Sequence, residues 1–275
     1  MNIPFLKLRV ADCAWIVFDR STTTAAPPSA DGDRPWPAVA RAVCDRHRGA
    51  AAVGVAAIEV DGDRLGVRTW DSGGEERSPT PAALLCASRL LFDAGRADAE
   101  TIELRTGDGT AEILVLDSRS FGLSVGLPAT DDGSPLDRRY GSGGLGLAAA
   151  PGAGVAMSLR VGGERADVAL YDGPRGARGD ARRGAARRAR GEVARVDAIA
   201  VARHELRIRR GSADPILAAA ASTAAAVVAD YADRETVVVV GGDRLVVQWP
   251  EGGPVFVAAA PEYCLSGEFW LPEEA

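Results

Sequence analysis

Short apolar runs, several of them alternating with polar residues, dominate the sequence and predict strands. Ile3–Val10 and Ala14–Asp19 have this pattern near the N-terminus. Val53–Val60 and Arg64–Trp70 predict a hairpin, because Asp61-Gly62-Asp63 between them is a turn sequence. Long helical runs are few, so the pattern indicates a β-rich fold.

Two stretches repeat one unit, a helical run followed by two paired strands. The first copy has a helix at Pro81–Ala94 and strands at Thr101–Thr106 and Ala111–Leu116. The second copy has a helix at Ile216–Tyr231 and strands at Glu235–Val240 and Arg244–Trp249. In this comparison Thr80 and Ala218 occupy matching places. A duplicated unit predicts two similar domains that face each other across a cleft.

Together these patterns predict an α+β fold of two pseudo-symmetric β-rich lobes, each built around one long helix. We place the lobes at residues 1–128 and 129–262. A further short helix is expected at Trp36–His47. Three segments read as loops: Ser21–Pro37, Thr130–Ala153 and Asp172–Gly191. The last contains seven arginines and is either a solvated loop or an anion-binding lid over the cleft.

Charge and composition exclude several function classes. The net charge of −6 and the low aromatic content of 5% argue against nucleic acid as a partner. The four cysteines form no CxxC pair and there are only two histidines, so neither a metal nor a disulfide framework is expected. No Walker A sequence is present, and we expect no organic cofactor.

The N-terminal segment carries charges too early for a signal peptide. The longest apolar run, Ile216–Ala229, is shorter than the roughly 20 residues that cross a bilayer. We therefore expect a soluble cytoplasmic protein with a small-molecule ligand and no membrane partner. A homodimer is compatible with these properties.

Four segments resemble, in their order and spacing, those of a known family: Val43–Gly49, Leu91–Gly95, Arg210-Gly211 with the Ala-rich run after it, and Gly253–Phe269. The family is that of diaminopimelate epimerase, which shares its fold with proline racemase and the phenazine-biosynthesis isomerase. The resemblance covers most of the chain. It implies that the final strand, within residues 263–275, returns to the first lobe.

In that family a cysteine stands at the start of each central helix, and the two thiols move a proton off and onto opposite faces of the substrate carbon. The resemblance implies that Thr80 and Ala218 stand at these two positions. The acid and the base of diaminopimelate epimerisation are then both missing. Thr80 can at most hydrogen-bond or relay a proton, and Pro81 removes an N–H from the anion cradle.

The positions that hold substrate in the family are also changed. Cys13, Asp71 and Asp197 stand where the family has asparagines, and Arg165 ends a segment that replaces Gly-Asn-Pro-His. Arg210 matches the family arginine, whereas Arg209 replaces the glutamate before it. The expected substrate-binding residues are therefore Cys13, Arg165, Asp197, Arg209 and Arg210.

Two functions from different classes stay open. In the first, the chain is a cofactor-independent isomerase, cyclase or lyase for a small anionic metabolite in the inter-lobe cleft, and not a diaminopimelate epimerase. Asp71 or Glu76 would then transfer the proton, with a pKa raised by desolvation, and Thr80 would assist. In the second, the cleft has decayed and the protein is a non-catalytic binding or scaffold partner of a biosynthetic enzyme.

Overall fold

The computed structural model describes residues 2–20, 36–62, 64–97, 100–136, 154–173, 194–211 and 214–270. The chain divides into two compact units, unit 1 (Met1–Gly122 with Ala260–Ala275) and unit 2 (Leu123–Ala259). The boundaries expected from the sequence, after Pro128 and Glu262, lie a few residues further along. Residues 21–35, 137–153 and 174–193, which make up most of the three expected loops, lie outside the described part of the chain.

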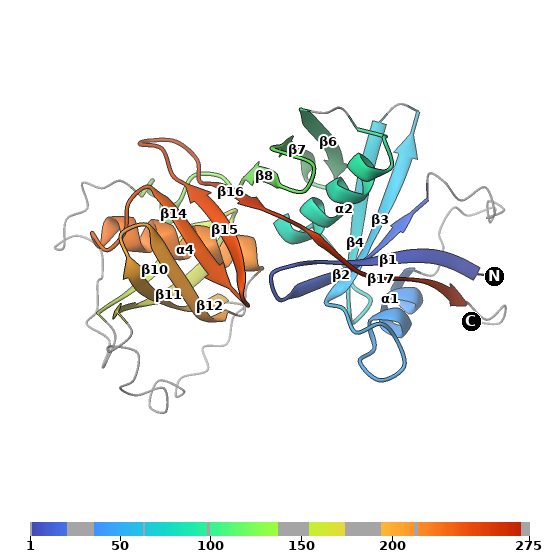
Figure 1. The fold of residues 1–275 in the computed structure, drawn as a ribbon, viewed down its shortest axis with the longest axis horizontal. Coiled ribbons are helices and arrows are strands. Elements are labelled where there is room, and N and C mark those ends of the chain that lie inside the picture. The colour runs from blue at the N-terminus through green and yellow to red at the C-terminus, as the bar shows by residue number, and fades with distance from the viewer. Residues whose placement is uncertain are drawn as a thin grey trace. The chain divides into compact units, whose positions relative to one another are not determined.

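Unit 1 is a mixed sheet in which the strands pair in the order β17-β1-β2-β3-β4-β6-β7. The β2–β3 and β4–β6 pairs are parallel and the others are antiparallel (Figure 1). The strands are β1 (Asn2–Val10), β2 (Cys13–Asp19), β3 (Gly54–Asp61), β4 (Arg64–Asp71), β6 (Thr101–Thr106), β7 (Gly109–Val115) and β17 (Glu262–Trp270). The short β5 (Glu76–Arg77) pairs with β4, and β8 (Phe121–Ser124) crosses the unit boundary.

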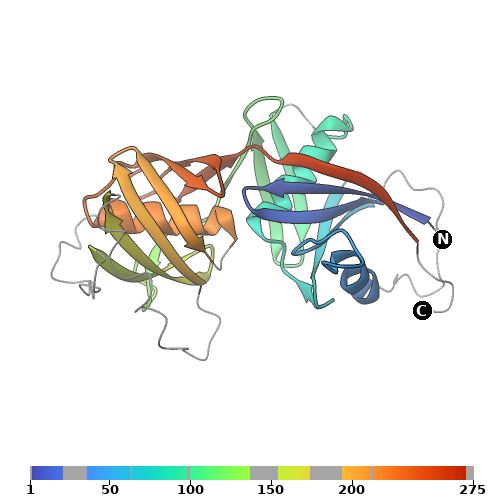
Figure 2. The same ribbon diagram turned by 60° about the horizontal axis from the view of Figure 1, so that its bottom comes forward.

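Two helices pack on this sheet. Helix α2 (Pro81–Asp93) contacts β1, β2, β3, β4 and β7, and helix α1 (Trp36–Cys44) contacts β3 and β4 (Figure 2). Ile16 of β2 belongs to the core under α1, whereas its neighbour Val17 lines a cavity with Leu90 of α2. Because successive residues of a strand point to opposite faces, the two helices lie on opposite faces of the sheet.

Unit 2 surrounds one helix, α4 (Pro215–Val228), which contacts every strand from β10 to β16. The strands are β9 (Ala129–Thr130), β10 (Val155–Val161), β11 (Glu164–Asp172), β12 (Ala194–Ala202), β13 (Glu205–Gly211), β14 (Glu235–Val240), β15 (Asp243–Gln248) and β16 (Phe256–Ala259). Within the described residues, no helix is both long and apolar enough to cross a membrane.

The two units repeat one order of strand pairings. In unit 1 the hairpins β1-β2 and β3-β4 join in parallel, and α2 leads to a third hairpin, β6-β7, that joins β4 in parallel. In unit 2 the hairpins β10-β11 and β12-β13 join in parallel, and α4 leads to β14-β15, which joins β13 in parallel. The predicted α+β fold with two pseudo-symmetric β-rich lobes around a helix is confirmed.

Stacked aromatic rings fill the core between α1 and the sheet. The rings of Trp36 and Trp70 lie 5.1 Å apart at an interplanar angle of 17°, and Phe18 meets Trp36 edge-on at 5.4 Å. Aromatic pairs in such offset or edge geometry add stability beyond the area that they bury. Trp36, the first residue of α1, is therefore the largest side chain by which the helix packs on the sheet, together with Val39, Ala40, Val43 and Cys44.

Helix α1 ends at Cys44, three residues before the end expected from the sequence. The side-chain Oδ1 of Asp45 accepts hydrogen bonds from the backbone N–H groups of His47 (2.8 Å) and Arg48 (2.7 Å). Such a local turn competes with continued helix. Gly49 completes the turn, since a Cβ there would lie 2.3 Å from the carbonyl oxygen of Val43.

We predict that Trp36→Ala lowers the free energy of unfolding of unit 1 by about 3–5 kcal/mol, because it leaves a large cavity against Trp70 and Phe18. Urea unfolding followed by fluorescence measures this. The matched control is Trp270→Ala, since Trp270 is 65% exposed and Trp36 only 1%. The control should change stability by at most about 0.5 kcal/mol. Equal effects of the two variants would contradict the packing role of Trp36.

Candidate functional site

The loop between β4 and α2 carries three of the predicted site residues, Asp71, Glu76 and Thr80. Asp71 organises the loop. Its Oδ1 accepts hydrogen bonds from the backbone N–H groups of Gly73 (2.9 Å) and Glu75 (3.0 Å), and its Oδ2 accepts one from Arg77 Nε (3.3 Å). The loop also rests on α1, because a Cβ at Gly74 would lie 2.4 Å from the carbonyl oxygen of Pro37. Asp71 therefore holds a fixed turn.

The environment of Asp71 lowers its pKa. Burial alone would raise the pKa of this carboxyl group, but the Glu75 N–H, the Arg77 side chain and the Gly73 N–H together outweigh burial. The prediction that desolvation raises the pKa of Asp71 is therefore wrong, because the sequence does not reveal how many donors converge on the carboxylate.

Glu76 is held in the same way by one partner. Arg68 binds it through two parallel hydrogen bonds of 2.8 Å, from Nε and from a terminal guanidinium nitrogen. This pair lowers the pKa of Glu76 and outweighs the effect of burial. Arg68 also lies over the Trp70 ring at 5.0 Å. The predicted rise in the pKa of Glu76 is therefore wrong as well.

Thr80 is the N-cap of α2. Its backbone is extended, with φ −73° and ψ 157°, and its Oγ1 accepts a hydrogen bond of 3.3 Å from the N–H of Ala83. Pro81 follows at the first helical position, where the missing N–H costs little. The hydroxyl oxygen thus satisfies a donor of the first turn.

Helix α4 starts four residues earlier than the alignment of the two copies requires. Asp214 is its N-cap, with Oδ1 accepting from the N–H of Ile216 at 2.9 Å, and Pro215 is its first residue. Ala218 lies inside the first turn, where its N–H bonds to the carbonyl of Asp214 at 2.8 Å. Thr80 and Ala218 are therefore not at matching places, and the structural counterpart of Thr80 is Asp214. The sequence did contain a signal for this match, because each helix begins with a capping residue followed by proline, Thr80-Pro81 and Asp214-Pro215.

The remaining predicted residues divide between the two units. Cys13 is the first residue of β2 in unit 1 and takes part in no disulfide. In unit 2, Arg165 lies 3.0 Å from Asp131. Asp197 on β12 is directly opposite Arg210 on β13, next to a β-bulge, and Arg209 is exposed. Bulges often mark positions at which a strand re-aims a side chain.

Among the described residues, the Cys44 thiol is unreactive and no cluster of metal ligands is present. Burial, helped by the charge of Asp71, raises the pKa of Cys44 to about 12, so this thiol stays protonated. The described histidine, cysteine and acidic side chains include no group of three or more that could hold a metal ion.

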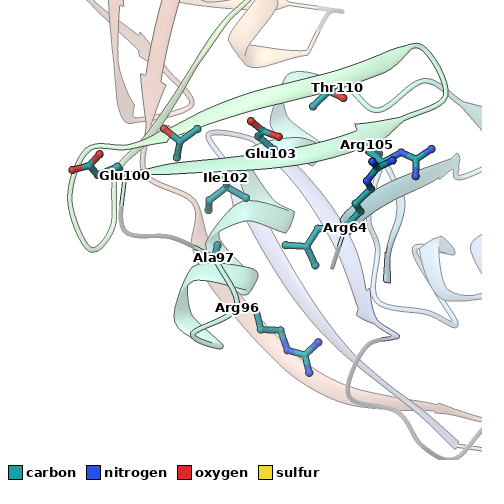
Figure 3. Close-up of a pocket in the computed structure, with 10 residues that line it drawn as sticks. Arg64, Arg96, Ala97, Glu100, Ile102, Glu103, Arg105 and Thr110 are labelled. Atoms are coloured by element: carbon teal, nitrogen blue, oxygen red, sulfur yellow. The ribbon is translucent and has the colours of Figure 1, made fainter. Parts of the chain in front are cut away.

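Charged side chains instead line two cavities in unit 1 that sequence reasoning missed. The larger has a volume of about 1000 Å³ and the smaller about 530 Å³, and Arg64 and Arg105 border both. Figure 3 shows Arg64 and Arg105 at one end of the larger cavity. The signal in the sequence was the pair Arg64 and Arg68, which lie four residues apart on β4 and so point to the same face of the strand. The search for a site had concentrated on the expected inter-lobe cleft.

Solved structures show what the fold is similar to. A phenazine biosynthesis protein of the PhzF family from Enterococcus faecalis matches with a TM-score of 0.66 and 13% identity, over 98% of this chain and 100% of that one. A hydroxyproline epimerase from Agrobacterium vitis matches with a TM-score of 0.58 and 12% identity, over 98% and 91%. The chain has the diaminopimelate epimerase-like fold.

Comparison with known sequences finds a relative as well. An O-ureido-serine racemase from Streptomyces lavendulae is 26% identical over 130 residues. The match covers 46% of this chain and 42% of the racemase, less than half the length of either. No protein-family model matches the sequence.

We predict that Thr80→Ala and Asp214→Ala each lower the free energy of unfolding by about 0.5–2 kcal/mol, because each removes a helix cap. Thr80→Ser and Asp214→Asn keep an oxygen acceptor and should recover most of the loss. Thermal unfolding measures both pairs. A Thr80→Ser variant as unstable as Thr80→Ala would contradict the capping role.

A second prediction concerns Asp71 and pH. Because the folded-state pKa is lowered, its charge stabilises the fold above the ordinary carboxyl pKa of about 3.9, and this contribution is lost as the pH falls through the folded value. Asp71→Asn should therefore destabilise the protein at neutral pH, and the difference should shrink below about pH 4. The effect is small because the side chain is 36% exposed and solvent screens its ion pair.

The control for this prediction is a double-mutant cycle with Arg77→Gln, measured by urea unfolding at neutral and acid pH. The coupling between Asp71 and Arg77 should be present at neutral pH and absent in acid. A coupling that persists unchanged in acid would show that charge is not its origin.

Proposed function

We propose that the protein is a cofactor-independent isomerase, cyclase or lyase that acts on a small anionic metabolite and is not a diaminopimelate epimerase. The observation that carries this proposal is the likeness, along 98% of the chain, to an epimerase and to a phenazine biosynthesis protein. The partial sequence match to a racemase supports it. Isomerases, cyclases and lyases of this kind share one requirement, a base beside an acidic C–H bond.

The lowered pKa values of Asp71 and Glu76 favour some types of reaction over others. Asp71 and Glu76 are ionised at neutral pH, so neither can donate the proton that a two-base racemisation returns to the substrate. A carboxylate with a low pKa is a weak base and removes only a proton that is already acidic. Elimination or cyclisation of an activated substrate therefore fits these side chains better than racemisation of a free amino acid.

The arginines before α4 supply the substrate anchor in this proposal. Arg209 and Arg210 lie near the end of strand β13, which ends at Gly211, shortly before the helix begins at Pro215. A guanidinium group binds a carboxylate through two parallel hydrogen bonds, which fixes orientation as well as charge. Asp214 at the helix start repels an anion, so the anion should lie on the arginines and not on the helix N-terminus.

One observation favours a second function, a non-catalytic binding or scaffold partner of a biosynthetic enzyme. Both helix starts are occupied by groups of the chain itself, the Thr80 hydroxyl and the Asp214 carboxylate. Both loop carboxylates are committed to arginines. Such a site can bind a ligand without turning it over.

We predict that diaminopimelate shows no enzyme-catalysed exchange of its α-proton in deuterated water, because the thiol pair is missing. The same NMR assay is applied to O-ureido-serine and trans-4-hydroxy-L-proline, and product formation is followed with β-substituted amino acids that carry a leaving group. If the protein is an enzyme, Arg210→Gln should lower the rate of turnover about 10²–10⁴-fold. The matched control, Arg119→Gln, should leave the rate unchanged.

The outcomes separate the two functions. A ligand that raises the melting temperature without exchange or turnover supports the binding partner. Exchange of the α-proton of diaminopimelate at an enzyme-like rate would contradict both proposed functions. It would mean that another acid and base do the work of the missing thiol pair.

A further inference from the structure

Strand β17 forms one edge of the unit 1 sheet. Among the strands that the structure describes, it pairs with β1 alone, and Figure 2 shows it (red) beside β1 (blue). It is nine residues long and largely exposed, with Tyr263 at 41% and Leu265 at 43%. The corresponding strand of unit 2, β9, pairs with β10 over only two residues. Proteins protect sheet edges by keeping them short or by placing lysine or proline on them, and β17 has none of these features.

A proline in β1 shows which backbone groups of β17 face this edge. Pro4 lies opposite Glu268 and has no N–H, so this pair cannot exchange two hydrogen bonds. The bonds between the two strands are therefore made at the alternate pairs, such as Phe5 with Gly267. Because backbone groups alternate in direction along a strand, the N–H and C=O groups of Ser266 and Glu268 point away from β1.

A second copy of β17 fits this edge in one register. Antiparallel pairing about a two-fold axis at Gly267 places Ser266 opposite Glu268 of the second copy, so that their outward backbone groups exchange hydrogen bonds. An axis at Glu268 would bring two carboxylates face to face. An axis at Ser266 would pair Glu268 with Cys264, which lies at a shift of register with β1 and is not in regular strand geometry.

The side chains favour the same register. Phe269 packs against the core under α1, and Leu265, four residues earlier, points to the same face. Pairing about Gly267 buries the exposed Leu265 against Phe269 of the second copy. At the axis, a Cβ on Gly267 would lie 2.9 Å from the Phe5 ring, so this ring covers the glycine. Glycine in a strand often marks a place where another backbone approaches closely.

We propose that the protein forms a symmetric homodimer in which the β17 strands of two copies pair in antiparallel orientation about Gly267 and join the two unit 1 sheets. The paired segment is short compared with the roughly 20–30 residues a side of a standard interface, so we expect a weak, reversible dimer. No residue assigned to the reaction lies in this segment. The dimer therefore stands independently of the proposed function.

Sedimentation velocity of the full chain, from micromolar to millimolar concentration at constant ionic strength, tests the proposal. Ser266→Lys places a cation opposite Glu268 of the second copy and should strengthen the dimer about threefold or more, whereas Ser266→Glu should weaken it by a similar factor. Ser118→Lys and Ser118→Glu make the same changes of charge at an exposed turn and are the matched controls. They should leave the equilibrium unchanged.

Two further changes test the strand pairing itself. Ser266→Pro removes an outward N–H without removing a bond to β1, so it should abolish the dimer. In a Cys264→Ser background, Gly267→Cys should form an intermolecular disulfide, because residues on the axis lie about 4.5 Å apart at Cα and the end of the Phe5 ring can move aside. Ser266→Cys in the same background should not, because its two copies are not opposite each other.

Circular dichroism and thermal unfolding confirm that each variant is folded. The expected result is a concentration-dependent dimer that responds to the sign of the charge at position 266. The proposal is overturned if the chain stays monomeric up to millimolar concentration, or if the folded Ser266→Pro variant dimerises as well as the unchanged protein. It is also overturned if Ser266→Lys and Ser266→Glu shift the equilibrium in the same direction.

Discussion

A helix that is enclosed by strands on all sides must be apolar around its whole circumference, and its side chains must be small enough for the strands to approach. Helix α4 meets this constraint, since all residues from Pro215 to Val227 are buried and most are alanine. Close packing at this density leaves no space for longer side chains. Helix α2 meets it only in part, because Arg89 and Asp93 reach the surface and bind Tyr263. The strand order of each unit depends on this enclosed helix.

Enclosing the two helices leaves some of their hydroxyl groups without hydrogen bonds. The hydroxyl groups of Ser88, Ser222 and Thr223 are buried and, among the described residues, have no hydrogen-bond partner. An unsatisfied buried hydroxyl costs about 1–3 kcal/mol. Ser88 and Ser222 each lie eight residues after their helix N-cap, so the two copies share this feature. The duplication is thus visible in the polar residues of the helices as well as in the strands.

The sequence predicted the fold well because its signals are local and periodic. Alternating apolar residues marked the strands of both copies, and the β14 bounds were predicted to the residue. The start of α4 was predicted to within one residue, but Ala218 was wrongly matched to Thr80 because an Ala-rich run has no internal landmark and the cap at Asp214 lay outside the family motif. The pKa directions of Asp71 and Glu76 depend on donors from Gly73, Glu75, Arg68 and Arg77. No pattern of residue types specifies such a geometry.

The cavities of unit 1 escaped prediction for a related reason. They exist because β4 and β6 meet at one pair of residues, and the length of a parallel pairing depends on where the chain leaves and re-enters the sheet. The arginines at positions 64, 68, 77 and 105 come from three strands, β4, β5 and β6, and each by itself resembles ordinary surface charge. Only the register of the sheet brings them to one wall.

The last of the described strands, β17, pairs with the first, β1. β17 pairs with β1 from Asn2 and Trp270 to Arg9 and Glu262, with one shift of register between Lys7 and Leu8, and the Tyr263 hydroxyl donates to Asp93 at 2.8 Å. Unit 2 is contiguous in sequence, whereas unit 1 is interrupted by it. During synthesis on a ribosome, unit 2 can therefore complete its sheet while β1 still has an open edge. The edge of β1 closes only after β17 has been made, so among the described strands β1 needs protection from wrong partners for the longest time.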